Sequence, residues 1–318
     1  MRFTHGHVPL FLFLCALVWS CSEIVHCKNQ TLPQSEVDAL KKIGAKLRKD
    51  WNFTVNPCSG TSGWVDKTGA VNVKCGACTA NYCHITSIVL QGQNLTGSLP
   101  DEFSNLTSLQ KIDLSFNYLN GNIPAAWASI PLTDIELEGN HITGRIPDEL
   151  GRITSLQYLS LESNLIEGPL PQSLGNLTNL LGLNVIANNI IGRLPESLGH
   201  LKNMTYFLIG GNPITGKIPS FIGNWIQLYK LEIRGTSLEG PFPPIFFSLQ
   251  NIVDLRVSDL KGGDGKFPLL QNMTNLNILV LRNMSIIDEL PAYIGNMTML
   301  AYLVLSLAIH SSFSFHLG

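Results

Sequence analysis

A compact group of cysteines and one histidine is the first candidate for chemistry. It comprises Cys75, Cys78, Cys83 and His84, and Cys58 precedes it in the chain. Thiolate and imidazole ligands at such short spacings can hold a zinc ion. In an exported chain, however, thiols are normally oxidised, which favours two disulfides over a metal site. Four cysteines allow three pairings, and the spacing does not choose among them. We therefore predict two disulfides, no metal ion and no cofactor.

Other catalytic patterns are weak. The eight histidines are scattered and form neither an HExxH pair nor a triad-like arrangement. Lys67-Thr-Gly69 and Ser108-Leu-Gln-Lys111 are similar to β-lactamase elements but occur in reverse order. Gly262-Gly-Asp-Gly265 lacks the ending of a phosphate-binding loop. The chain also has no HRD or DFG motif. The sequence therefore predicts a protein that is not an enzyme.

Composition excludes two further classes of protein. Hydrophobic residues make up 45% of the chain and charged residues 14%, which argues against a disordered protein. A nucleic-acid partner requires a dense basic face, whereas here 21 basic residues stand against 23 acidic ones, with a net charge of -2. We expect an ordered protein that does not bind nucleic acid.

The start of the chain is typical of an export signal. Arg2 precedes an apolar run from Val8 to Trp19, which is too short to cross a bilayer. The pattern predicts a signal peptide over residues 1–27 and a secreted chain. Residues 300–309 are the most apolar later stretch, and they too fall short of the roughly 20 residues that a span needs.

A repeat dominates the sequence after His84. Its period is 24 residues in most steps. Residues 156–171 give one unit, LQYLSLESNLIEGPLP, in which the alternating apolar residues describe a short strand with one buried face. Such strands stack into one parallel sheet around a shared core. The predicted unit starts are Thr86, Leu109, Leu132, Leu156, Leu180, Met204, Leu228, Ile252, Leu276 and Leu300.

Three further residue types recur at fixed positions of the units and form columns when the units are aligned. An asparagine offers donors and acceptors to buried backbone groups, a glycine permits a tight turn, and a proline closes that turn. The asparagine ladder is expected at Asn94, Asn117, Asn140, Asn164, Asn188 and Asn212.

Both ends of the repeats need covering. Residues 32–47 have helical apolar spacing, and with Trp51 and Trp64 they predict a disulfide-bonded cap over residues 28–85. Residues 86–305 hold about nine complete units and a partial tenth. Over residues 306–318 the pattern diverges, because the asparagine, glycine and proline signals never arrive. We expect an open end there, with an uncovered core and strand edge, and hence a truncated chain.

The strand positions between the buried leucines should face outward and form a recognition surface. This surface runs from acidic residues, through small and apolar ones, to a mixed basic region. We expect the apolar side chains to anchor a ligand and the charged ones to orient it. The candidate ligand-binding residues are Asp134, Glu136, Glu138, Glu162, Ile186, Tyr206, Leu208, Lys230, Arg234, Arg256 and Arg282.

The repeat resembles the extracellular part of plant leucine-rich-repeat receptor-like kinases, notably in the GxIP form of Gly144-Arg-Ile-Pro147. Residues 51–53, 57–58 and 113–121, the cysteine cluster and the irregular unit ending at 267–270 are similar to the subgroup with a malectin-like domain after the repeats. The resemblance implies an α/β solenoid, a right-handed leucine-rich-repeat superhelix with a parallel β-sheet on its concave face. It also implies an extracellular peptide, protein or glycan ligand, and other plasma-membrane receptors as partners.

The leading hypothesis is a ligand-recognition domain of such a receptor, non-catalytic in this chain, secreted as it stands and at the plasma membrane in a full-length receptor. The alternative is a secreted repeat protein of the cell wall space, acting as a decoy or as an inhibitor of a cell-wall enzyme. Inhibitors of that kind end in a paired-cysteine cap, and no cysteine follows Cys83.

Glycosylation sequons are dense, as expected outside the cell. Asn94 is set aside because it belongs to the predicted ladder, and Asn283 is expected on the strand face. The predicted sites are Asn29, Asn52, Asn105, Asn176, Asn203, Asn272, Asn283 and Asn296.

Overall fold

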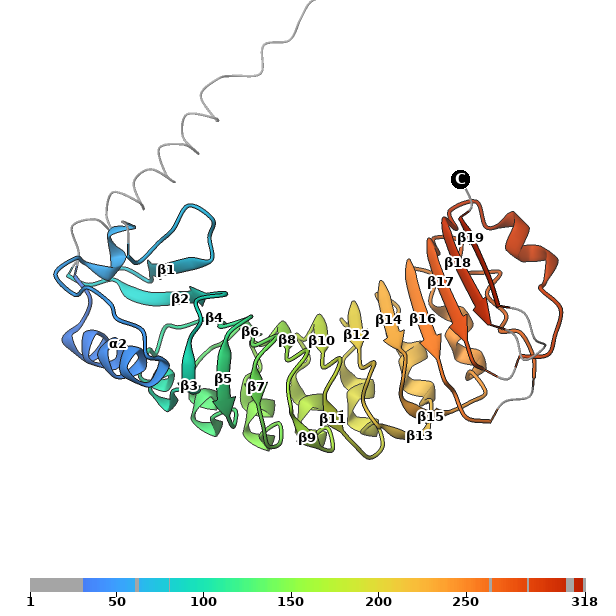
Figure 1. Cartoon of the computed structure of the whole chain (residues 1–318), viewed down its shortest axis with the longest axis horizontal. Coiled ribbons are helices and arrows are strands. Elements are labelled where there is room, and N and C mark those ends of the chain that lie inside the picture. Colours follow the sequence, from blue (N-terminus) through green and yellow to red (C-terminus); the bar gives the residue numbers. More distant parts are fainter. Residues whose placement is uncertain are drawn as a thin grey trace, which may run out of the picture.

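The coils of the chain stack into an arc, with one long sheet along the inner rim and short helices along the outer rim (Figure 1). This computed structural model describes residues 31–60, 63–79, 81–262, 265–284, 286–306 and 312–316. The predicted signal peptide and the sequon at Asn29 lie outside these residues. Within them, no helix has both the length and the apolar character needed to cross a membrane.

The inner rim is a 12-stranded sheet. From β2 to β18 every neighbouring pair is parallel, because each coil enters the sheet in the same direction. The end strands β1 and β19 pair antiparallel. In sheet order the strands are β1 (Val71–Gly76), β2 (His84–Leu90), β4 (Lys111–Asp113), β6 (Asp134–Glu136), β8 (Tyr158–Ser160), β10 (Gly182–Asn184), β12 (Tyr206–Leu208), β14 (Lys230–Ile233), β16 (Asp254–Ser258), β17 (Ile278–Arg282), β18 (Tyr302–Ser306) and β19 (Ser312–His316).

The core runs the length of the arc as columns of aliphatic side chains. In one coil Leu156, Leu159 and Leu161 are all buried. Leu159 lies in register with Ile135 on one side and Leu183 on the other, so each leucine packs between its counterparts in the neighbouring coils. Truncation of such a side chain costs roughly 2–5 kcal/mol, which makes this stacking the main source of stability.

The asparagine ladder fastens one coil to the next. The Nδ2 of Asn164 donates to the carbonyls of Leu137 at 2.9 Å, Leu161 at 3.0 Å and Glu162 at 3.2 Å, and its Oδ1 accepts the Ile142 N–H at 3.0 Å. These groups are buried from water, so the side chain supplies the partners that the turning backbone lacks. Equivalent bonds are made by Asn117, Asn140, Asn188 and Asn212.

The glycine and proline columns make the turn to the outer rim. Gly97 has φ +99°, and a Cβ there would lie 2.3 Å from the carbonyl oxygen of Lys46, so only glycine fits. Each proline then precedes a 3-10 helix, since its fixed φ suits the first turn. These helices are η2 (Asp101–Asn105), η3 (Ala125–Ser129), η4 (Asp148–Arg152), η5 (Gln172–Asn176), η6 (Glu196–His200), η7 (Ser220–Asn224), η8 (Pro244–Ser248) and η9 (Ala292–Asn296).

Short strands between the inner sheet and the 3-10 helices form three smaller sheets. They follow the ladder position of each coil, which is Gln93 before β3 and Thr236 before β15, and several of them contain the glycine of the turn. Their members are β3 (Thr96–Ser98), β5 (Tyr118–Gly121) and β7 (His141–Ile142), then β9 (Glu167–Gly168) with β11 (Asn189–Ile190), and β13 (Thr215–Lys217) with β15 (Ser237–Glu239).

The first coil differs in register from the sequence prediction. Ile88 pairs with Ile112, which places the start of the unit at Ile85 and not at Thr86. Ile85 and Ile88 are both fully buried. A shift by one residue would turn them to the opposite face of the sheet, so burial fixes the register.

This register changes the role of Asn94. The ladder position of the first coil falls on Gln93, and Asn94 is exposed with φ +53°. Asn117 of the next coil accepts from the N–H groups of Gln93 and Leu95 on either side of it. The predicted ladder role of Asn94 is therefore wrong, and its sequon lies at the surface.

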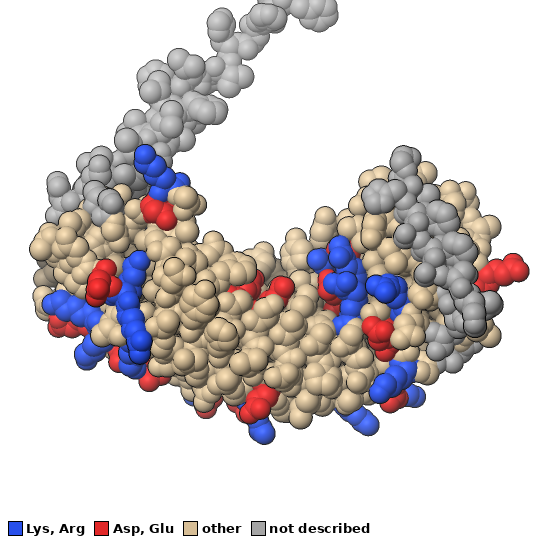
Figure 2. Space-filling view, viewed as in Figure 1, with Lys and Arg blue, Asp and Glu red and all other residues tan. Residues whose placement is uncertain are grey.

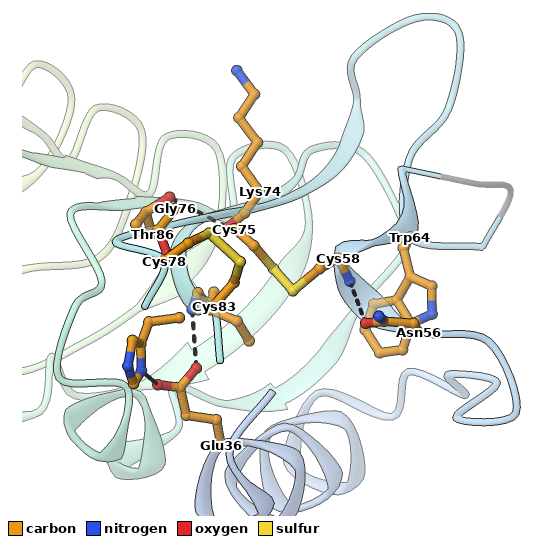
Figure 3. Close-up of a disulfide and its surroundings, with 12 residues drawn as sticks. Glu36, Asn56, Cys58, Trp64, Lys74, Cys75, Gly76, Cys78, Cys83 and Thr86 are labelled. Carbon is orange, nitrogen blue, oxygen red and sulfur yellow. Dashed lines mark hydrogen bonds and ion pairs between the residues drawn. A yellow bond between two sulfur atoms is a disulfide. The ribbon is translucent and has the colours of Figure 1, made fainter. Parts of the chain in front are cut away.

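The N-terminal cap is helix α2 (Gln34–Leu47) with β1 and the short helix η1 (Pro57–Ser59). Disulfides join Cys58 to Cys75 and Cys78 to Cys83, which decides among the three pairings (Figure 3). The buried carboxylate of Glu36 reaches from α2 to the first coil. Its Oε1 lies 2.6 Å from Nδ1 of His84, and its Oε2 accepts the N–H of Ile85 at 2.9 Å.

The far end of the sheet is covered differently from the prediction. We expected the edge of the last repeat strand to be open, but β19 pairs with β18 antiparallel along its length. Ser306 pairs with Ser312, so the chain folds back on itself after the last unit. The backbone groups of β18 are thereby satisfied on both sides.

Candidate functional site

The inner rim presents the side chains that lie between the buried ones. On β6, Asp134 and Glu136 flank the buried Ile135, and Glu138 follows the buried Leu137. The three acidic side chains line one shared hollow. This is the arrangement that strand alternation predicts.

One acidic residue of the rim is neutralised by a neighbour. The Nζ of Lys111 on β4 lies 2.6 Å from Oε1 of Glu136. Burial raises the pKa of Glu136; the Lys111 hydrogen bond offsets part of this rise, and repulsion from Asp113 adds to it. Asp113, although it stands at an outward position of its strand, is buried and accepts the N–H of Ser115.

The other acidic side chains bind only neutral groups. Glu138 accepts a hydrogen bond from the hydroxyl of Ser160, and Glu162 accepts one from Nδ2 of Asn184 at 2.7 Å. Asp134 accepts from a neighbouring threonine hydroxyl at 2.5 Å. Among the residues that the structure describes, none of these three carboxylates lies within 4.0 Å of a cationic nitrogen. Within the described residues these three carboxylates therefore make no close ion pair, and Asp134 interacts with Lys111 only at longer range.

Two tyrosines form the apolar floor beside these acids. Tyr158 on β8 and Tyr206 on β12 lie in register on either side of Gly182 on β10. A Cβ at Gly182 would lie 2.9 Å from Cδ1 of Tyr158, so the glycine leaves room for that ring to lean over the strand. Together with Leu208 and the acidic residues they enclose an open hollow of about 350 Å³, which we call the acidic hollow.

The basic half of the rim is internally paired. Arg256 Nε lies 2.7 Å from Asp254, and Lys230 lies 3.5 Å from the same carboxylate. Arg234 binds Glu232 through Nε at 3.0 Å. Asp254 and Glu232 are buried beneath these cations, so both signs of charge are largely satisfied within the chain.

A second hollow, of about 420 Å³, lies where the turns leave β10 to β18. Ile186, Arg234, Asp259, Arg282 and Asn283 are among its lining residues. Hydrogen bonds from Ser258 and from Asn283 hold the pKa of Asp259 below its usual value. Figure 2 shows the two halves of the rim, with acidic side chains toward its middle and Lys and Arg side chains gathered nearer β14 and β16.

The predicted ligand residues thus fall into three groups. The acidic hollow contains Asp134, Glu136, Glu138, Tyr206 and Leu208, with Glu162 bonded to its Asn184. The paired network contains Lys230 and Arg256, and the second hollow contains Ile186, Arg234 and Arg282. Sequence reasoning missed Tyr158 and Ser160, although both occupy the same outward positions of their unit as the residues that were chosen.

The described sequon asparagines are all exposed: Asn52, Asn94, Asn105, Asn176, Asn203, Asn272, Asn283 and Asn296. Asn105, Asn176 and Asn296 end 3-10 helices of the outer rim, away from the recognition surface. Asn283 lines the second hollow, where a glycan would obstruct it.

The described residues contain no cluster of three or more His, Cys, Asp or Glu side chains arranged to hold a metal ion. All four cysteines of the cap are in disulfides, and the nearby His84 binds Glu36. The cap is therefore a structural element in this chain.

Comparison with known proteins agrees with the geometry of the coils. The family model described as Leucine Rich Repeat matches residues 108–130 and 155–177. The coils are leucine-rich repeats. The two matched segments correspond to the units that hold Lys111, Asn117, Tyr158 and Asn164.

The relatives are receptor-like kinases. The chain is 45% identical over 112 residues to a probable leucine-rich repeat receptor-like serine/threonine-protein kinase of Arabidopsis thaliana, covering 33% of this chain and 11% of that protein. A second Arabidopsis thaliana relative with a similar name is 44% identical over 135 residues, covering 37% of this chain and 12% of the relative. The chain spans about a tenth of the length of these relatives.

Solved structures share much of the arc. The leucine-rich-repeat ectodomain of the plant membrane receptor kinase GASSHO1/SCHENGEN3 from Arabidopsis thaliana, in complex with CASPARIAN STRIP INTEGRITY FACTOR 2, has a TM-score of 0.67 at 26% identity, over 84% of this chain and 34% of that one. The SOBIR1 receptor kinase ectodomain from Arabidopsis thaliana has a TM-score of 0.50 at 30% identity, over 57% of this chain and 95% of that one.

A plant ice-binding protein shares the fold as well, with a TM-score of 0.62 at 24% identity, over 79% of each chain. The same solenoid thus carries different functions, and the function of this chain must be argued from its exposed residues.

Proposed function

We propose that this chain is the ligand-recognition part of the ectodomain of a plant receptor-like kinase, placed outside the cell and without catalytic activity of its own. The observation that carries the proposal is the inner rim, where outward strand positions of successive coils line two open hollows of different charge. A continuous face of this kind suits an extended ligand that lies across many strands.

The comparisons support the same function. The matched relatives are named receptor-like kinases, and the GASSHO1/SCHENGEN3 ectodomain is described in complex with a factor that binds it. The plant peptide hormone receptor RGFR1, 27% identical over 65% of this chain with a TM-score of 0.52, is described in complex with RGF2. An extracellular peptide is therefore the first ligand class to test, with proteins and glycans next, and other plasma-membrane receptors are candidate partners.

Assignment to the subgroup with a malectin-like domain stays a prediction from the sequence. It rests on the cap motifs, the cysteine cluster and the irregular unit near residues 267–270. Sequencing of transcripts from the same locus tests it: a malectin-like domain encoded after the repeats supports the subgroup, and another domain in that place contradicts it.

Peptide selection tests the proposed function. The secreted, glycosylated chain is used to select from a library of displayed random peptides, and selected peptides are mapped by hydrogen exchange. We expect protection on β6 to β17 of the inner rim. Protection confined to the 3-10 helices of the outer rim would refute the proposal. A glutamine substitution at the outlying Glu167 serves as the control and should leave binding unchanged.

A further inference from the structure

We propose that the acidic hollow binds an arginine side chain of an extended peptide. The inference rests on the proposed function and names the chemistry of one part of the ligand. Its elements are the ring of Tyr158 leaning over Gly182, the neighbouring ring of Tyr206, and the carboxylates of Asp134 and Glu138.

Charge complementarity selects a cationic occupant. In and beside the hollow lie four carboxylates, Asp134, Glu136, Glu138 and Glu162, and Asp113 is close enough to repel Glu136; among the described residues the ammonium of Lys111 is the one cation within 4.0 Å of any of the four. That ammonium is already bound to one of the four at 2.6 Å. A second cation would therefore gain attraction from Glu138 and Glu162, and from Asp134, which interacts with Lys111 only at a distance beyond 4.0 Å, in a recess where water screens charge less than on open surface.

The basic half of the same rim shows the contrast. There the acids Glu232 and Asp254 are buried beneath Arg234, Arg256 and Lys230, at distances from 2.5 to 3.9 Å. Three of these pairs join residues two apart along the chain, and the fourth joins Lys230 to Asp254 on the next strand. In the coils of the acidic hollow, the position of Lys230 carries Tyr158, Gly182 and Tyr206 instead, so no cation stands there.

The tyrosine floor favours arginine among cations. A guanidinium is planar, stacks on aromatic rings and binds a carboxylate through two N–H groups at once. Tyr158 is 38% exposed, and its ring lies over the strand and not upright, because Gly182 has no side chain to hold it away. An arginine could stack on this ring while its N–H groups reach Glu138 or Asp134 in the adjacent coil of β6.

Two blocked heptapeptides test the proposal by NMR titration against the full chain. Both contain glycine and serine with one central position, which is arginine in the first and its neutral isostere citrulline in the second. We expect the arginine peptide to bind about tenfold more tightly, the size of one cation–aromatic contact together with a partial ion pair. Equal affinity of the two peptides would overturn the proposal.

Variants then locate the site. Glu138→Gln and Tyr158→Ala should each bring the arginine peptide close to the affinity of the citrulline peptide, and Glu167→Gln, which removes the same charge from an exposed position on β9, should not. Circular dichroism verifies that each variant is folded. If Glu138→Gln, which keeps the shape of the side chain, has no effect, the arginine is bound elsewhere and the proposal fails. Selected peptides that protect the inner rim but bind without an arginine would contradict this inference and leave the proposed function intact.

Discussion

Replacing Asn164 by alanine should destabilise the chain by about 3 kcal/mol. The side chain has two N–H hydrogens and one carbonyl oxygen, and it satisfies three carbonyls and the N–H of Ile142 at 2.9 to 3.2 Å. Each of its three bonding groups contributes about 1 kcal/mol net. Asn164 is only 6% exposed, so water cannot fully replace the lost partners.

The matched control is Asn94→Ala, at a residue that the sequence pattern assigns to the same ladder. Asn94 is exposed and lies one position beyond the ladder, so its replacement removes no ladder bond and should cost about 1 kcal/mol at most, from placing alanine at φ +53°. Urea unfolding followed by circular dichroism measures both, and hydrogen exchange should show the largest loss of protection in the coils next to Asn164. Equal destabilisation by the two substitutions would refute the register that we assign to the first coil.

Three further predictions concern charge, turns and the cap. Burial raises the pKa of Glu136 above its ordinary 4.5 in the folded chain, so ionisation of this carboxyl removes stability as the pH rises from 4.5 to the raised value. Glu136→Gln should therefore make the urea midpoint of unfolding less dependent on pH over that window. A variant whose midpoint keeps the same slope against pH contradicts this. At Gly97, φ is +99° and an added Cβ would lie 2.3 Å from a carbonyl oxygen, so Gly97→Ala should lower the stability in thermal unfolding by about 3 kcal/mol. Gly69→Ala, at φ +80° in open space, should lower it by about 1 kcal/mol. Similar costs for the two variants would show that crowding is unimportant. Replacing Cys58 and Cys75 together by serine opens a disulfide that spans 17 residues and should cost about 3 kcal/mol, with protease cleavage appearing first in the cap; cleavage that begins in the repeats instead would contradict this.

Much of the recognition surface could be predicted because strand alternation is local. Once Ile135 and Leu137 are assigned to the core, Asp134, Glu136 and Glu138 must face outward, and the structure has them on one hollow. What the pattern could not supply was the relation between strands. Tyr158 was missed because its importance depends on the missing side chain of Gly182 in the next coil, 24 residues later.

Charge compensation likewise depended on neighbours in space. Lys230 and Arg256 are outward residues in the sequence pattern, yet both bind Asp254 and form part of an internal network. Asp134 and Glu138 look the same in sequence and have only neutral partners. Part of the difference is local, because Arg256 lies two residues from Asp254 on one strand, and part comes from the parallel register, which sets Lys230 beside the same carboxylate.

The sequence by itself determined the solenoid, since a 24-residue alternation of leucines with recurring asparagine, glycine and proline has one way to bury its apolar face. Tertiary structure alone decided the start of the first coil at Ile85, the pairing of Cys58 with Cys75 and the antiparallel cover of β18 by β19. The physical reason is range. Periodicity and turn chemistry act within one unit, whereas register, disulfide partners and charge pairing are set by contacts between segments that only folding brings together.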